Sequence, residues 1–187
     1  MRDDRNKWTA ALGINRPPVK NEHLRLAVIN TQRQTLISGP YTRCLDICKL
    51  AQATGWPQII TGNNYALRLR RDRILVVDGP SLDDGWHHDA GVSISDMSSA
   101  YVLVEIKGES ALELLNRGAD LNVDIASGSV ARNFRGFDVL IYRWQSQTQF
   151  RMHFLHANLE AIWSLLQDYE KQVAEHKTAS DKIQLPQ

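Results

Sequence analysis

The most constraining feature of this sequence is an apolar stripe near its C-terminus. Burying Trp163 alone would remove roughly 200 Å² of surface from water, worth about 5 kcal/mol as an upper estimate. A helix that begins near Asn158 therefore has to pack on a sheet, which the rest of the chain must supply. The stripe recurs at spacings of three and four, the period of one helix face: Leu159, Ile162, Trp163, Leu166, Tyr169 and Val173.

The residues before this helix predict short helices and strands in an order that occurs twice. In the first half, a helix begins with Thr42 as its N-cap and ends at Gly55. In the second half, a helix begins at Ser110 and ends at Gly118. A weaker helical stretch is expected after Pro80. Strands are expected at residues 24–30, 58–61, 65–70 and 74–78, and again at 101–107, 129–134, 137–144 and 149–156.

Each half thus has the order strand, helix, antiparallel strands, helix. This order predicts an α+β fold in which two pseudo-repeated halves share a core, with helices covering a mixed or antiparallel sheet. The repeat rests on the order of elements alone. We expect one domain over residues 21–173, an extended N-terminal arm over residues 1–20, and a loose polar C-terminal tail over residues 174–187.

Composition excludes several classes of protein. An apolar share of 43% and a charged share of 23% are typical of a soluble globular chain. No apolar run approaches the length of a transmembrane helix, and no apolar stretch after Met1 could serve as a secretory signal. We therefore expect a cytoplasmic protein with no membrane partner. The net charge of +1 creates no general attraction for nucleic acid.

Two groups of residues resemble partial metal sites. Cys44 and Cys48 lie four apart on a predicted helix, on a face that Ile47 and Ala51 mark as apolar. We interpret both cysteines as core residues rather than ligands. His87, His88 and Asp89 are adjacent in a Gly-bounded stretch, and neighbouring imidazoles rarely reach one ion. We therefore expect no bound metal.

Two groups of arginines are candidates for binding. Arg68, Arg70, Arg71 and Arg73 surround the turn of a predicted hairpin. They form either a solvated face that discourages edge-to-edge association, or a surface for an acidic partner, a phosphate or a nucleic acid. Arg132 and Arg135, beside a second turn, are weaker candidates for clamping a carboxylate or phosphate.

The sequence holds no recognisable catalytic constellation. His153 and His156 are three apart at a predicted strand, so they point to opposite faces. The sequence contains no nucleophile elbow with a serine, no H-E-x-x-H motif and no Gly-rich phosphate-binding loop. We expect this chain to contain no catalytic residues and no cofactor of its own.

The second half resembles the gamma subunit of heterotetrameric sarcosine oxidase. The likeness is carried by the Asp-Met-Ser strand at residues 96–108, the Gly-bounded helix at 111–118, the turn at 120–124, a hairpin, and the Trp-containing helix around 161–166. The paired strands at residues 66–80 also match, so the resemblance covers roughly residues 45–170. The family has a cysteine in this turn, and the corresponding place here, around Ala119, has none. The wider relatives are the aminomethyltransferase-like folate-binding proteins, whose catalytic aspartate motif is not recognisable here.

This resemblance implies a small, non-catalytic subunit that packs against larger flavin-bearing subunits. In such an oxidoreductase, FAD, FMN, NAD and tetrahydrofolate belong to the other chains. The assembly would demethylate an N-methyl amino acid and pass the one-carbon unit to tetrahydrofolate. Two alternatives stay open: an autonomous folate-binding one-carbon transferase, and a nucleic-acid module using the hairpin from Arg68 to Arg73. The near-zero net charge weighs against the second, so we expect no nucleic-acid partner.

Overall fold

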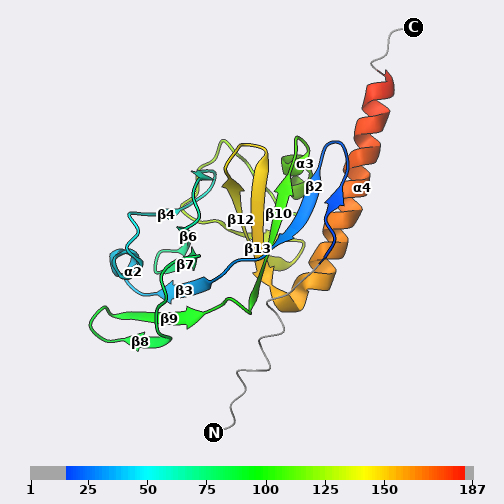
Figure 1. Cartoon of the computed structure of the whole chain (residues 1–187). Coiled ribbons are helices and arrows are strands. Elements are labelled where there is room, and N and C mark those ends of the chain that lie inside the picture. Colours follow the sequence, from blue (N-terminus) through cyan, green and yellow to red (C-terminus); the bar gives the residue numbers. More distant parts are fainter. Residues whose placement is uncertain (1–15, 184–187) are drawn as a thin grey trace.

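The computed structural model describes residues 16–183, with side chains described as far as His176. Two β-sheets pack face to face, and helices cover the outer face of each (Figure 1). The mixed α and β composition expected from the sequence is therefore confirmed. The pseudo-repeat and the relation to the aminomethyltransferase-like fold stay predictions.

The seven-stranded sheet takes its centre from the second half of the chain. There, β10 (Tyr101–Lys107), β13 (Gln149–Leu155) and β12 (Phe137–Trp144) pair antiparallel. Its outer strands are β2 (Arg25–Ile29), β1 (Val19–Lys20), β11 (Ala131–Phe134) and β5 (Ile59–Ile60). Only β5 runs parallel to its neighbour, β12.

The six-stranded sheet comes from the first half. Its order is β4 (Ala53–Thr54), β6 (Tyr65–Arg70), β7 (Arg73–Val77), β3 (Gln34–Ser38), β9 (Val92–Asp96) and β8 (Gly85–His87). All neighbours are antiparallel except β4 and β6. The hairpin predicted around Arg71 and Asp72 joins β6 to β7.

Helices and apolar clusters hold these layers together. The 3₁₀ turn η2 (His156–Asn158), α4 (Leu159–Ile183) and the short α3 (Ala111–Asn116) cover the seven-stranded sheet, while α2 (Tyr41–Cys48) covers the six-stranded one. All six residues of the predicted stripe are buried in the cluster beneath α4, as expected. A third cluster, which includes Leu67, Leu75 and Leu140, joins the two sheets.

Two predictions about secondary structure are wrong, and one strand was missed. The helix expected as far as Gly55 ends at Cys48, because Lys49 adopts a left-handed conformation with φ of 56°. The stretch after Pro80 forms strands β8 and β9 instead of a helix, and the alternation of Val92 and Ile94 with polar residues explains why. The strand β3 was not expected at all.

The termini also differ from expectation. The predicted loose tail from Ala174 is helical as far as Ile183, because no Gly or Pro interrupts it. Of the predicted arm, residues 1–15 lie outside the described residues, and β1 pairs with β2 in the sheet. Arg16 forms an ion pair with Glu160 and lies over the ring of Trp163, so this part of the arm contacts α4.

The two cysteines are core residues, as the sequence predicts. Cys44 and Cys48 are 0% and 1% exposed in the cluster beneath α2. Burial, followed by the neighbouring Cys48 thiol, raises the pKa of Cys44 to about 11. Burial also raises the pKa of Cys48. Both thiols therefore stay protonated near neutral pH, and they are poor ligands and poor nucleophiles.

Serine substitutions at these positions should have unequal effects. The Cys48 thiol donates to the Cys44 carbonyl oxygen at 3.1 Å, and a serine hydroxyl can do the same. We expect Cys48→Ser to cost less than about 1 kcal/mol of unfolding free energy, and Cys44→Ser about 1–3 kcal/mol, because a buried hydroxyl without a partner is costly. Urea denaturation measures both. Stoichiometric zinc or iron that either substitution removes would show that the cysteines are ligands.

Candidate functional site

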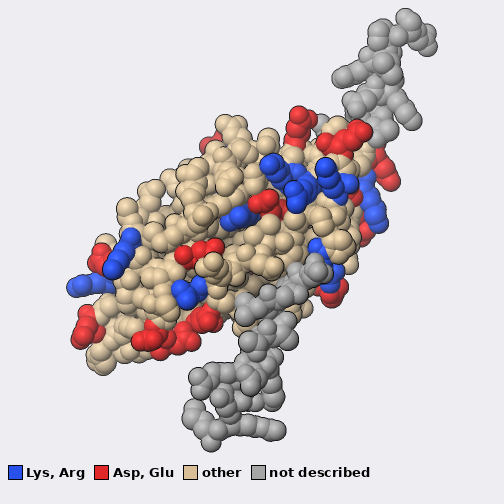
Figure 2. All heavy atoms as spheres, viewed as in Figure 1, with Lys and Arg blue, Asp and Glu red and all other residues tan. Residues whose placement is uncertain are grey.

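The arginines that the sequence analysis singled out line three hollows. Arg70 and Arg73 of the first group and Arg132 of the second line one hollow together, at the open end of the inter-sheet core. Arg68 lines another beside α2, and Arg135 lines a third beside α3. Arg71 is exposed in the hairpin turn. Figure 2 shows that basic and acidic side chains are interspersed over this face of the molecule.

Two of these arginines are held by their own neighbours. The Arg68 guanidinium lies 4.5 Å from the centre of the Tyr41 ring. Arg132 donates through one terminal nitrogen to the carbonyl oxygens of Ser129 and Ala131, at 3.0 and 2.8 Å, and its guanidinium lies over Trp56. Burial lowers the pKa of Arg132. Cation–π contacts of this kind stabilise the fold, and they leave each guanidinium group less available to bind a ligand.

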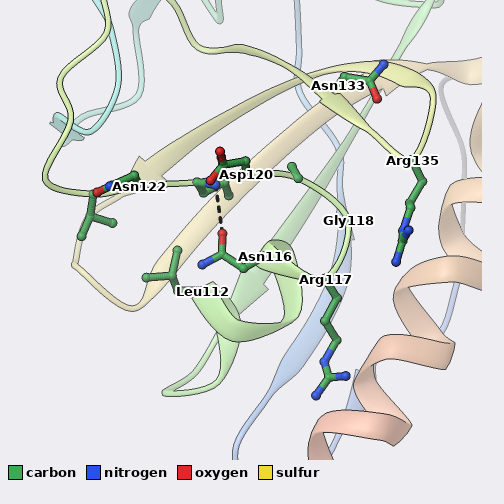
Figure 3. A pocket seen from close by; sticks show the side chains of 11 residues that line it. Leu112, Asn116, Arg117, Gly118, Asp120, Asn122, Asn133 and Arg135 are labelled. Carbon is green, nitrogen blue, oxygen red and sulfur yellow. Dashed lines mark hydrogen bonds between the residues drawn. The ribbon is translucent and has the colours of Figure 1, made fainter.

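The hollow beside α3 has a volume of about 670 Å³, and its two arginines turn toward α4 (Figure 3). Arg135 donates from Nε to the Tyr169 hydroxyl at 2.7 Å. Arg117 donates to Glu113 at 3.1 Å and to Gln172 at 3.3 Å. Arg117 is paired with Glu113, and Arg135 is bonded only through Nε to a neutral hydroxyl, so the hollow offers an anion one unpaired guanidinium at most. Arg132 and Arg135 line different hollows, and their anion-binding role stays a prediction.

A buried polar network between the two sheets was missed by the sequence analysis. The hydroxyls of Tyr65 and Tyr142 lie 2.7 Å apart, and Tyr142 is 2.8 Å from Nε2 of His153. Nδ1 of His153 lies 2.6 Å from Oε1 of Gln34. Arg151 donates to the Tyr65 hydroxyl at 3.1 Å. The alternation of polar Gln149, Arg151 and His153 along β13 was its only sequence signal.

The geometry of this network specifies one direction for its hydrogen bonds. Gln34 donates through its amide nitrogen to the Tyr101 carbonyl oxygen at 3.0 Å, so its Oε1 must accept from Nδ1 of His153. Nε2 of the neutral imidazole then accepts from Tyr142, which in turn accepts from Tyr65. The network is a directed chain that begins at the Arg151 cation and ends at a backbone carbonyl.

Burial governs the ionisation of the network. It lowers the pKa of His153 to about 3, and the charge of Arg151 acts in the same direction. Burial also raises the pKa of Tyr142 well above its usual value. His153 and Tyr142 are both neutral near pH 7 and 0% exposed, so they cannot exchange protons with a substrate. We interpret the network as a polar bridge that aligns the two sheets.

The histidines near β8 form no metal site in the structure. His87 hydrogen-bonds the Asp83 carbonyl oxygen at 2.7 Å, and the His88 ring lies edge-on to Trp86. Among the described residues, no group of three or more His, Cys, Asp or Glu side chains could hold a metal ion. None of the helices within residues 16–183 has both the length and the apolar character to cross a membrane.

The architecture is an α+β fold built from two packed sheets with helices outside them. No protein-family model matches the sequence, and no curated protein matches it. The fold is similar to a chain of the heterotetrameric sarcosine oxidase from Corynebacterium sp. U-96 in complex with pyrrole 2-carboxylate. The TM-score is 0.63 at 13% sequence identity, and the match covers 91% of this chain and 92% of that chain. The two chains are therefore similar in length and share a fold from end to end.

Proposed function

We propose that this chain is the small, gamma-type subunit of a heteromeric, flavin-dependent enzyme of the sarcosine oxidase type. The observation that carries the proposal is the end-to-end match in fold to a chain of heterotetrameric sarcosine oxidase. A match confined to one segment would be compatible with a shared motif, whereas nearly full coverage of both chains supports equivalent subunits. The family resemblance in residues 45–170 supports the same assignment.

The described side chains support a structural role in that assembly. The polar groups best suited to proton transfer, Tyr142 and His153, are sealed between the sheets. The cations beside α3 are bonded to residues of this chain. The flavins, NAD and tetrahydrofolate would be held by the partner subunits. Those subunits would demethylate an N-methyl amino acid in the cytoplasm, and this chain would shape and stabilise them.

Expression with and without larger flavoprotein subunits tests the proposal. The chain alone should elute colourless from gel filtration and should not oxidise sarcosine or dimethylglycine. Co-expressed with the large subunits, it should elute with flavin absorbance in one complex. A yellow, active, monodisperse protein from this chain alone would refute the subunit role. Saturable binding of tetrahydrofolate by the isolated chain would favour the autonomous transferase instead.

A further inference from the structure

A row of five residues crosses the six-stranded sheet on the face away from α2. The strand registers pair Arg70 with Arg73, Arg73 with Ser38, Ser38 with Ser93, and Ser93 with Trp86. Directly paired residues share a face of a sheet, so all five side chains point the same way. The hydrogen bond from Nε of Arg73 to the Ser38 hydroxyl, at 3.2 Å, agrees with this.

The residues next to the row in the sequence point toward α2. Since side chains alternate along a strand, the row itself faces away from α2. Ile37, Ile74 and Val92 belong to the cluster beneath α2. With neighbouring strands about 4.8 Å apart, the row extends roughly 19 Å, about the length of six residues of extended chain. We refer to these five residues as the cross-strand row.

The seven-stranded sheet leaves part of this face uncovered. The inter-sheet cluster uses residues of β6 and β7, and in Figure 1 β8 and β9 extend beyond β10, β12 and β13. Trp86, at the end of the row, is 61% exposed, and Leu155, at the rim of the other sheet, is 43% exposed. β8 is also an edge strand, so its outer backbone groups have no partner strand within the described residues.

The other end of the row opens into a hollow of about 300 Å³ with an apolar floor. Leu36, Leu69 and Leu140 line it together with Arg70, Arg73 and Arg132. Among the described side chains, none of these three guanidinium groups forms an ion pair with a carboxylate, and Arg132 donates to backbone carbonyls. Asp138 also lines the hollow, so three cations there face one carboxylate. A carboxylate flanked by an aliphatic group complements such a site.

The charges around Trp86 indicate which kind of partner fits. Asp83, Asp84 and Asp89 are exposed around β8, and Figure 2 shows acidic side chains along this edge of the molecule. A phosphate backbone that lay along the row would meet these carboxylates, which disfavours nucleic acid. A protein surface can match arginines at one end and acidic residues beside an indole at the other.

We infer that the cross-strand row, with Leu155 and the hollow at its basic end, is where this chain docks on a larger subunit. The inference rests on the proposed function. The docking segment would place an acidic side chain between Arg70 and Arg73 and apolar side chains against Trp86 and Leu155. Tryptophan and arginine are enriched among the residues that dominate binding energy at protein interfaces, and this row presents both.

Two pairs of variants of the full chain test the inference. Arg70→Glu reverses a charge in the row, and its control Arg71→Glu reverses the adjacent charge in the turn. Trp86→Ser removes an exposed apolar group from the row, and its control Ile125→Ser removes another, 64% exposed, from a different loop. All four positions are exposed, so we expect each variant to fold. Thermal denaturation verifies this before the binding is measured.

Affinity for the purified large subunits is measured by analytical ultracentrifugation. Arg70→Glu and Trp86→Ser should each weaken assembly at least about tenfold, whereas each control should stay within about twofold. Hydrogen exchange in residues 85–96 should slow on assembly. Added salt should weaken the wild-type complex more than the Arg70→Glu complex.

The outcomes separate this inference from the proposed function. A wild-type complex that tolerates both row variants, with unchanged exchange in residues 85–96, overturns the docking surface and leaves the subunit role standing. Failure of the wild-type chain to assemble overturns both. Salt-dependent binding of single-stranded oligonucleotides that Arg70→Glu abolishes would assign the row to nucleic acid instead.

Discussion

Trp163→Ala is expected to lower the free energy of unfolding by about 3–5 kcal/mol. Trp163 is 4% exposed and packs with α3 and the strands of the seven-stranded sheet in the largest apolar cluster. Truncation to alanine removes most of this contact and leaves a cavity, because the flanking Ile162 and Leu166 are held by their own neighbours. Chemical denaturation followed by far-ultraviolet circular dichroism measures the change.

Lys171→Ala provides a matched control on the same helix. The Lys171 side chain is 70% exposed, and its ion pair with Asp168, at 3.9 Å, is also at the surface. Its loss should change stability by less than about 0.5 kcal/mol. A Trp163→Ala effect as small as that of Lys171→Ala would mean that α4 is not essential to the core, contrary to the fold described.

The second large effect is a loss of stability in acid through His153. The pKa of this imidazole is lowered from 6.5 to about 3, by burial first and by the Arg151 cation second. Below pH 6.5 the unfolded chain therefore binds a proton that the folded chain does not. The stabilisation is fully present above pH 6.5, declines as pH falls, and is lost once pH passes the folded value near 3.

The size of this effect follows from the shift. Each pH unit within the window costs at most about 1.4 kcal/mol, which gives about 3 kcal/mol between pH 6.5 and pH 4. Carboxylates contribute to acid unfolding below about pH 5, so the comparison is with His153→Gln, which removes the titrating group. The difference in slope between wild type and His153→Gln, from urea titrations at several pH values, reports His153 alone.

His156→Gln, at the exposed end of the same segment, is the control for this experiment. At pH 7 its stability should stay within about 0.5 kcal/mol of the wild type. The His153→Gln profile should be flatter than that of the wild type between pH 6.5 and pH 5. A wild-type profile that is already flat in that range would show that His153 is solvated or protonated in the folded chain. The directed hydrogen-bond chain between the sheets would then be wrong.

The sequence analysis missed the network for a reason that β13 illustrates. Gln149, Arg151 and His153 alternate with Phe150, Met152 and Phe154, which is the pattern of a strand with one solvated face. In the structure a second sheet covers that face, and Arg151 and His153 are paired instead of hydrated. Their partners are far away in sequence: 86 residues separate Arg151 from Tyr65, and 119 separate His153 from Gln34.

The errors in secondary structure have a similar origin. After Pro80 the alternation is confined to the short β9, and β8 and β9 form because β3 offers an edge with which β9 can pair. The basic residues near the first hairpin were identified as one group, yet the register shift in β6 between Arg68 and Arg70 distributes them over two faces of the sheet. Arg68 turns toward Tyr41 of α2, whereas Arg70 and Arg73 share the opposite face with Trp86.

The sequence alone determined the features that depend on local period and local geometry. These include α4 and its buried stripe, the hairpins, the buried cysteines and the mixed α and β class. Only the tertiary structure decided which faces are covered, because a polar face of a strand has the same pattern whether water or a second sheet lies against it. For that reason the inter-sheet network and the uncovered cross-strand row emerged only once the two sheets were seen packed together.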